Sequence, residues 1–174
     1  SPKNSNSSCQ MMTTMGAHRL PTGPEAGPMT EQEQTVILEA REILARYFNQ
    51  NPLLTSWQAV LDYCAIAVRG EVECFHVLYL DRKNRLISDV RVSVGTVDHV
   101  PVYPREVLKC ALLMNASALI LVHNHPSGDP EPSDADLKMT KEIQTGCKTL
   151  GLTLHDHIIV GAGREISLRA RGDL

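Results

Sequence analysis

The spacing of apolar and polar positions predicts that the chain begins with two helices. Thr30 to Glu33 forms a capping box, and apolar residues then recur at helical spacing from Val36 to Phe48. A second helix is expected from about Ser56 to Val68, ending before Gly70. Its expected buried face consists of Trp57, Val60, Leu61, Cys64, Ala65 and Val68.

The pattern then changes to that of strands. Glu73–Leu80 is dense in β-branched and aromatic residues and predicts a strand buried on both faces, which a polar turn joins to a partner strand over Leu86–Val94. Pro104 suits the first position of a helix over Arg105–Met114. The residues expected to face inward from that helix are Val107, Leu108, Ala111 and Leu112.

Strand and helix alternate in the last part of the chain. A continuous apolar run predicts a strand over Ala118–His123, and a helix is expected from Ser133 to Leu150, followed by a hairpin of Leu152–Val160 and Glu165–Leu168. The inward residues of that helix are expected to be Leu137, Ile143 and Leu150. The order of elements, helices followed by β-β-α-β-α-β-β, predicts an α/β fold in which helices flank a mixed central sheet.

Composition narrows the class of protein. The chain has 174 residues, of which 43% are hydrophobic, so one domain with a real core is expected over residues 30–174. Residues 1–29 are rich in Ser, Asn, Pro, Gly and Met without a period, and we expect a disordered tail there. The five cysteines form no paired motif, and no run approaches the ~18 apolar residues of a membrane span, which indicates a cytoplasmic protein with reduced thiols. The net charge of -3 argues against broad electrostatic binding to nucleic acid.

The stretch 119–139 contains the residues with the clearest chemistry. His123 and His125 stand two apart at the end of a predicted strand, so their side chains point to the same side of the sheet. A loop rich in Pro, Gly and Asp leads to Ser133, a suitable N-cap, and Asp136 follows three residues later. Two imidazoles and one carboxylate, with a fourth position left to water, are typical of a catalytic zinc site.

Two positions of this predicted site have competing candidates. Asp134 is an alternative to Asp136 as the acidic ligand, and Ser133 with Asp136 is also an ordinary helix-start signal. A hydrolytic zinc site further needs a carboxylate that takes a proton from water. Glu71 and Glu73, at the start of the first strand, are the candidates for that base.

We interpret the other histidines as structural. His155 and His157 repeat the two-residue spacing inside a strand, and we expect hydrogen-bonded rings that support the sheet or the metal ligands. His76 receives the same interpretation. His18 lies in the expected disordered tail, and His99, in the loop before the third helix, has no obvious partner.

These residues resemble the JAMM motif of the JAB/MPN metalloenzyme family, and the closer resemblance is to its RadC-like members. The motif is His123-x-His125-Pro126 followed by Ser133-x-x-Asp136, and the resemblance covers roughly Leu54 to Leu174. The other segments that match are Glu73–Asp81, Gly95–Asp98, Val102–Glu106, Ser127–Pro130 and Asp156-His157.

The resemblance implies a JAB/MPN fold of cytidine-deaminase-like architecture and a hydrolytic activity. One Zn²⁺ ion would be held by His123, His125 and Asp136, with water as the fourth ligand. Glu73 would be the general base, and Ser133 would donate a hydrogen bond to the developing oxyanion. The implied substrate is a peptide, an isopeptide or a small amide.

Two departures from the family pattern keep other functions open. Asn124 stands where the deubiquitinating members have Ser or Thr, and the helix-hairpin-helix segment of full-length RadC proteins is not recognisable. One alternative is a nuclease or DNA-binding protein, which the RadC resemblance and the basic turn at 82–85 suggest. The other is a non-catalytic MPN scaffold. Edge strands in the two hairpins would allow a homodimer, and no membrane partner is expected.

Overall fold

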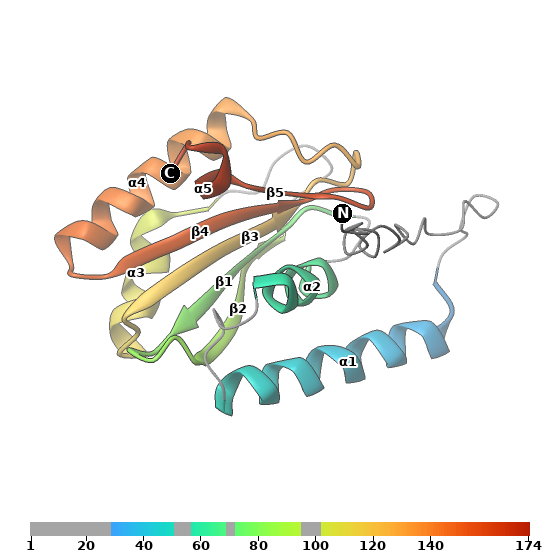
Figure 1. Cartoon of the computed structure of the whole chain (residues 1–174). Helices are drawn as coiled ribbons and strands as arrows, with labels where there is room; N and C mark the ends of the chain where they lie inside the picture. The colour runs from blue at the N-terminus through green and yellow to red at the C-terminus, as the bar shows by residue number, and fades with distance from the viewer. Residues whose placement is uncertain (1–28, 51–56, 69–71, 95–101) are drawn as a thin grey trace, which may run out of the picture.

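A five-stranded sheet in the order β2-β1-β3-β4-β5 forms the centre of the computed structural model, which describes residues 29–50, 57–68, 72–94 and 102–174 (Figure 1). The strands are β1 (Cys74–Leu80), β2 (Leu86–Val94), β3 (Ala118–Asn124), β4 (Thr153–Val160) and β5 (Glu165–Ser167). Strands β3 and β4 are parallel, and every other neighbouring pair is antiparallel.

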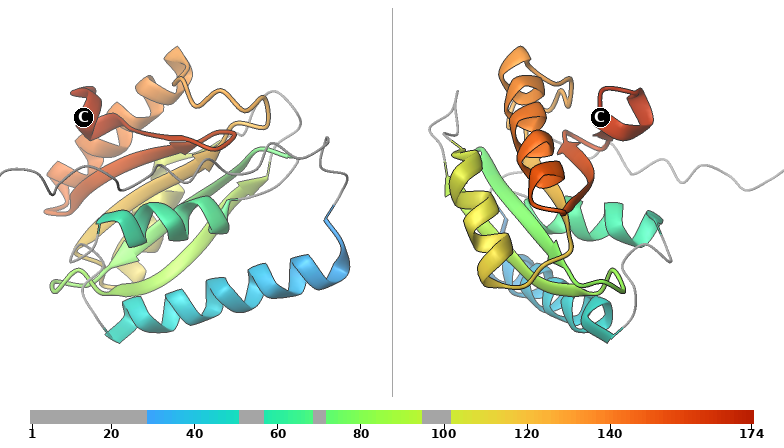
Figure 2. Two further views of the ribbon diagram at one scale, coloured as in Figure 1. Left: turned by 45° about the vertical axis from the view of Figure 1, so that its right-hand side comes forward. Right: turned by 90° about the vertical axis from the view of Figure 1, so that its left-hand side faces the viewer.

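Helices cover both faces of this sheet. They are α1 (Glu31–Gln50), α2 (Trp57–Ala67), α3 (Pro104–Leu113), α4 (Asp134–Thr149) and the short α5 (Leu168–Arg171). Figure 2 shows α1 and α2 on one face and α3 and α4 on the other. The fold therefore has three layers and two hydrophobic cores.

The two central strands, β1 and β3, are buried along their whole length because each contributes to both cores. Leu78 and Ile120, opposite each other in the register, pack toward α1 and α2. Val77 and Leu121, the next pair, pack toward α3 and α4. A strand covered on both faces has no polar side, which explains its continuous apolar sequence.

The predicted fold class and order of elements are confirmed, with boundaries within about two residues. The exposed fractions of Trp57 (38%), Leu112 (52%) and Leu150 (43%) show that their predicted burial was wrong. Trp57 is the first residue of α2, and the two leucines line a surface hollow at the end of the sheet where β3 and β4 begin. The other inward residues are buried or half-buried.

The C-terminus also differs from its prediction. The expected strand Glu165–Leu168 ends at Ser167, whose hydroxyl accepts a hydrogen bond from the Ala170 amide and caps α5. The predicted tail through residue 28, together with Glu71, His18 and His99, lies outside the described residues. Within the described part, no helix combines the length and apolar character that crossing a membrane requires.

The connection between the two parallel strands determines where chemistry can occur. Strand β3 runs into the loop 125–133, and α4 then returns the chain so that β4 pairs beside β3. The C-terminal end of β3 and the N-terminal end of α4 consequently meet at one edge of the sheet, where α/β folds commonly place their ligands.

Candidate metal centre

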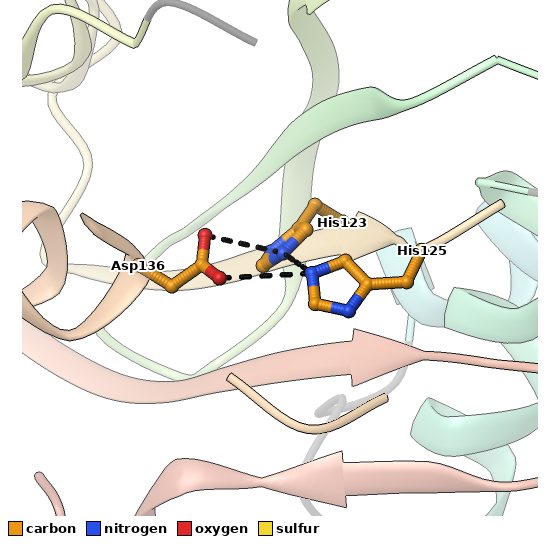
Figure 3. A group of neighbouring side chains, drawn as sticks. All are labelled: His123, His125 and Asp136. Carbon is orange, nitrogen blue, oxygen red and sulfur yellow. Dashed lines mark hydrogen bonds and ion pairs between the residues drawn. The ribbon is translucent and has the colours of Figure 1, made fainter. Parts of the chain in front are cut away.

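His123, His125 and Asp136 converge at this edge, as Figure 3 shows. His123 is the penultimate residue of β3, His125 directly follows the strand, and Asp136 lies in the first turn of α4. The Nε2 atoms of the two histidines are 2.9 Å apart. Asp136 places Oδ1 3.4 Å from His123 Nε2 and Oδ2 3.6 Å from His125 Nε2. The structure therefore brings together the three residues that the sequence predicts as ligands.

The orientation of the His125 ring suits a metal ligand. Its Nδ1 lies 2.8 Å from the main-chain oxygen of Asp129, which can only accept a hydrogen bond. The ring proton therefore lies on Nδ1, and Nε2 turns an electron pair toward His123 and Asp136. Electron pairs that face one another at such short distances repel unless a proton or a cation lies between them. Two nitrogens, one carboxylate oxygen and an open fourth position fit Zn²⁺.

Ser133 fixes the orientation of the Asp136 carboxylate. The Ser133 hydroxyl donates to Asp136 Oδ2 at 2.6 Å and accepts from the Asp136 amide at 3.2 Å. The Ser133 amide donates to the same Oδ2 at 2.8 Å, which completes a capping box. Asp134, the first residue of α4, is exposed and is not part of the converging group in the described structure.

Burial and charge set the protonation of the three converging residues. Burial lowers the pKa of His123 to about 4, although the Asp136 charge opposes the shift. Burial also disfavours the Asp136 carboxylate, but its interactions with His125 and His123 and the hydrogen bonds from Ser133 outweigh that effect and hold the pKa of Asp136 below the usual range. Stabilisation of its protonated form by Asp136 raises the pKa of His125. A neutral buried histidine beside an ionised carboxylate is the state that a divalent ion requires.

Glu73 lies at the same edge of the sheet as the triad. It directly precedes β1, which pairs with β3 so that Phe75 is opposite His123. The Glu73 side chain is half-buried, and its negative charge contributes to the raised pKa of His125. Its role as a base, like the role of Ser133 toward an oxyanion, stays a prediction.

Three residues without a predicted catalytic role surround the candidate ligands. Asn124, between the two histidines, accepts from the Cys74 amide and donates to the Val72 carbonyl. Behind His123, the buried His157 and Thr140 form hydrogen bonds with each other. The interpretation of His157 as a hydrogen-bonded residue that supports the sheet or the ligands agrees with these contacts. One feature of the sequence could have pointed to Thr140: it stands four residues after Asp136 and therefore lies on the same helix face.

The turn between β4 and β5 holds the loop that begins with His125. The Ala162 amide donates to the Gly128 carbonyl at 2.8 Å, and Arg164 pairs with Asp129 at 2.8 Å. The His125 amide donates to the Val160 carbonyl at 2.9 Å. The loop is therefore anchored on both sides of Pro126, which keeps His125 close to His123.

Comparison with known proteins gives similarities over most of the chain. Residues 54–173 match the family model described as the RadC-like JAB domain. A UPF0758 protein of Rhodobacter capsulatus is 55% identical over 156 residues, which cover 88% of this chain and 73% of that protein. A UPF0758 protein of Ruegeria pomeroyi is 60% identical over 126 residues, which cover 72% of this chain and 56% of that protein. The names of these relatives state no substrate or activity.

Proposed function

Because the chain belongs to the RadC-like JAB domain family, we propose that it is a zinc-dependent hydrolase of the JAMM type. Its substrate would be a peptide, an isopeptide or a similar amide. The observation that carries the proposal is the convergence of His123, His125 and Asp136, with one ligand atom from each within 4.8 Å of the others. Their nitrogen and oxygen donors suit Zn²⁺ and leave an open coordination position.

The chain's own residues supply the remaining steps. When bound, a zinc ion provides Lewis-acid chemistry, which polarises a carbonyl and lowers the pKa of water to about 7. Glu73 accepts a proton from the attacking water and later gives it to the leaving nitrogen. The Ser133 hydroxyl, which donates to Asp136 in this structure, would turn to donate to the developing oxyanion.

Measurements of zinc binding and of turnover test the metal site and the hydrolase activity separately. Zinc titrated into chelator-treated protein should bind at about one equivalent, and His123→Ala and Asp136→Ala should abolish that binding. His155→Ala is the matched control, because His155 is hydrogen-bonded to Asn84 at the other end of the sheet. Unchanged binding in both ligand variants would reject the proposal.

Substrate screening then separates the hydrolase from a metal-binding scaffold. Zinc-loaded protein is screened against peptides, isopeptides and single-stranded or branched DNA. Glu73→Gln should keep the metal and lose turnover, and full activity in this variant would remove Glu73 from the mechanism.

We do not favour the DNA-binding alternative, because in the basic turn Arg85 is paired with Asp81 at 2.9 Å. The homodimer stays a prediction.

A further inference from the structure

A continuous path of hydrogen bonds connects the main chain of Asp136 with the buried ring of His123. The Thr140 hydroxyl lies 2.6 Å from the main-chain oxygen of Asp136 and 2.6 Å from His157 Nδ1. His157 Nε2 lies 2.8 Å from His123 Nδ1. The side chains of Thr140, His157 and His123 are all buried. The path therefore runs from α4 through β4 to β3 without reaching solvent.

The acceptor at the start of this path determines which atom carries the proton in each of its hydrogen bonds. The main-chain oxygen of Asp136 can only accept, so the Thr140 hydroxyl donates to it. The Thr140 oxygen must then accept from His157, which places the proton of that ring on Nδ1. His157 Nε2 is left as an acceptor, so His123 donates to it from Nδ1. His123 Nε2 consequently keeps its electron pair on the side where His125 and Asp136 converge.

We propose that Thr140 and His157 are positioning residues that hold His123 in the one tautomer and ring orientation able to bind a metal ion. This inference rests on the proposed metal site and gives two further residues a role in it. Partners of this kind behind a ligating histidine commonly change metal affinity roughly 10- to 100-fold when they are removed. The path also couples two ligands from different elements, because a shift of α4 at Asp136 moves the main-chain acceptor that orients Thr140 and, through His157, the His123 ring.

The first test is zinc affinity, measured by competition with a chromophoric chelator. His157→Phe keeps an aromatic ring but removes the acceptor, and Thr140→Val keeps the shape of the side chain but removes the hydroxyl. We expect His157→Phe to weaken zinc binding roughly 10- to 100-fold and Thr140→Val roughly 10-fold. Thr140→Ser retains the hydroxyl and should bind within about threefold of the wild type. His155→Phe, two residues away on β4, should also bind like the wild type.

The second test reads the tautomer directly and requires neither zinc nor turnover. Nitrogen-15 NMR of the metal-free protein should show His123 protonated on Nδ1 and unprotonated on Nε2, and Thr140→Val should mix the two tautomers. A His123 ring with the opposite assignment would overturn the inference even if the protein binds zinc. So would wild-type zinc affinity in His157→Phe, once urea unfolding shows that the variant is folded. A protein with the expected tautomer that binds zinc but hydrolyses nothing would reject only the hydrolase proposal.

Discussion

Asn124 holds the main chain on both sides of Glu73. Its side-chain oxygen accepts from the Cys74 amide at 2.7 Å, and its side-chain nitrogen donates to the Val72 carbonyl at 3.0 Å. Asn124 itself stands between the two histidine ligands on β3, so one residue links the proposed base to the metal site. Ser or Thr at this position would be too short to repeat both contacts.

This bridge predicts that Asn124→Ala separates turnover from metal binding. Removing the side chain leaves two main-chain groups without their partner, which should cost about 2 kcal/mol of unfolding free energy. Glu73 would lose its fixed position while the ligands keep theirs, and a displacement of about 1 Å can cost roughly 100-fold in rate. We expect turnover to fall more than tenfold and zinc affinity to stay within about threefold.

The control for this variant is Asn49→Ala, which removes one side-chain hydrogen bond to the Leu86 carbonyl far from the site. It should lower the unfolding free energy slightly and leave turnover unchanged. If Asn124→Ala loses zinc and turnover in parallel, the residue supports the ligands and not the base.

Local spacing predicts that His123 and His125 face the start of α4, and the resemblance to the JAMM motif selects Asp136 over Asp134 as their partner. Residues two apart on a strand share a side, which aligns His123 with His125, and a capping box fixes Asp136 against Ser133 within one helical turn. The loop between them is short, so no long-range information was needed to bring the three ligands together.

The support behind the ligands could not be predicted in the same way. The contact between His123 and His157 depends on how β4 is aligned beside β3 after the α4 crossover, and a shift of one residue would turn His157 to the other face. The contact between Asn124 and Cys74 likewise depends on the pairing of β1 with β3. Helical periodicity also could not predict that Leu112 and Leu150 are exposed, because it does not show where the sheet beneath a helix ends.

Ser133 should contribute to metal affinity even though it is not a ligand. Ser133→Ala removes the hydroxyl that donates to Asp136 Oδ2 and caps α4. The lost cap should cost about 1 kcal/mol of stability, and the freed carboxylate should weaken zinc binding roughly tenfold. Chelator competition and urea unfolding measure the two effects. Ser167→Ala, which removes the cap of α5, is the control and should leave zinc affinity unchanged.

A buried carboxylate on the other face of the sheet should make stability depend on pH. Asp89 on β2 accepts hydrogen bonds from Arg41 of α1, Tyr63 of α2 and His76 of β1, at 2.7, 2.6 and 2.7 Å. Burial disfavours the charged form, but the contacts with His76, Tyr63 and Arg41 outweigh it and lower the Asp89 pKa below the ordinary value of 3.8. The carboxylate therefore ties both helices to the sheet while it is ionised.

The sign of the pH effect follows from this lowered pKa. Below pH 3.8 the unfolded state takes up a proton before the folded state does, so the stabilisation present at neutral pH is lost as the pH falls through the folded-state pKa. Asp89→Asn should cost about 3 kcal/mol at pH 7, and the difference from the wild type should shrink as the pH falls below 3.8. Urea unfolding from pH 7 to pH 3 measures it, with the exposed Asp62→Asn as control. A difference that stays constant down to pH 3 would contradict the assignment.

Gly161 should be essential for the position of the loop that carries His125. A methyl group at Gly161 would lie 2.4 Å from the Gly128 oxygen and 2.6 Å from the Pro130 ring. Gly161→Ala must therefore push the loop away from the β4–β5 turn, and the Asp129 carbonyl that orients His125 moves with it. We expect roughly tenfold weaker zinc binding together with a lower melting temperature.

Gly163→Ala separates this displacement from simple strain in the turn. Gly163 has a φ of 73° and open space around the position of a methyl group, so the substitution costs about 1 kcal/mol through its backbone alone. Both variants should have a lower melting temperature than the wild type, but only Gly161→Ala should bind zinc more weakly. Equal affinities in the two variants would mean that the site tolerates movement of the loop and that His125 is oriented by its own strand.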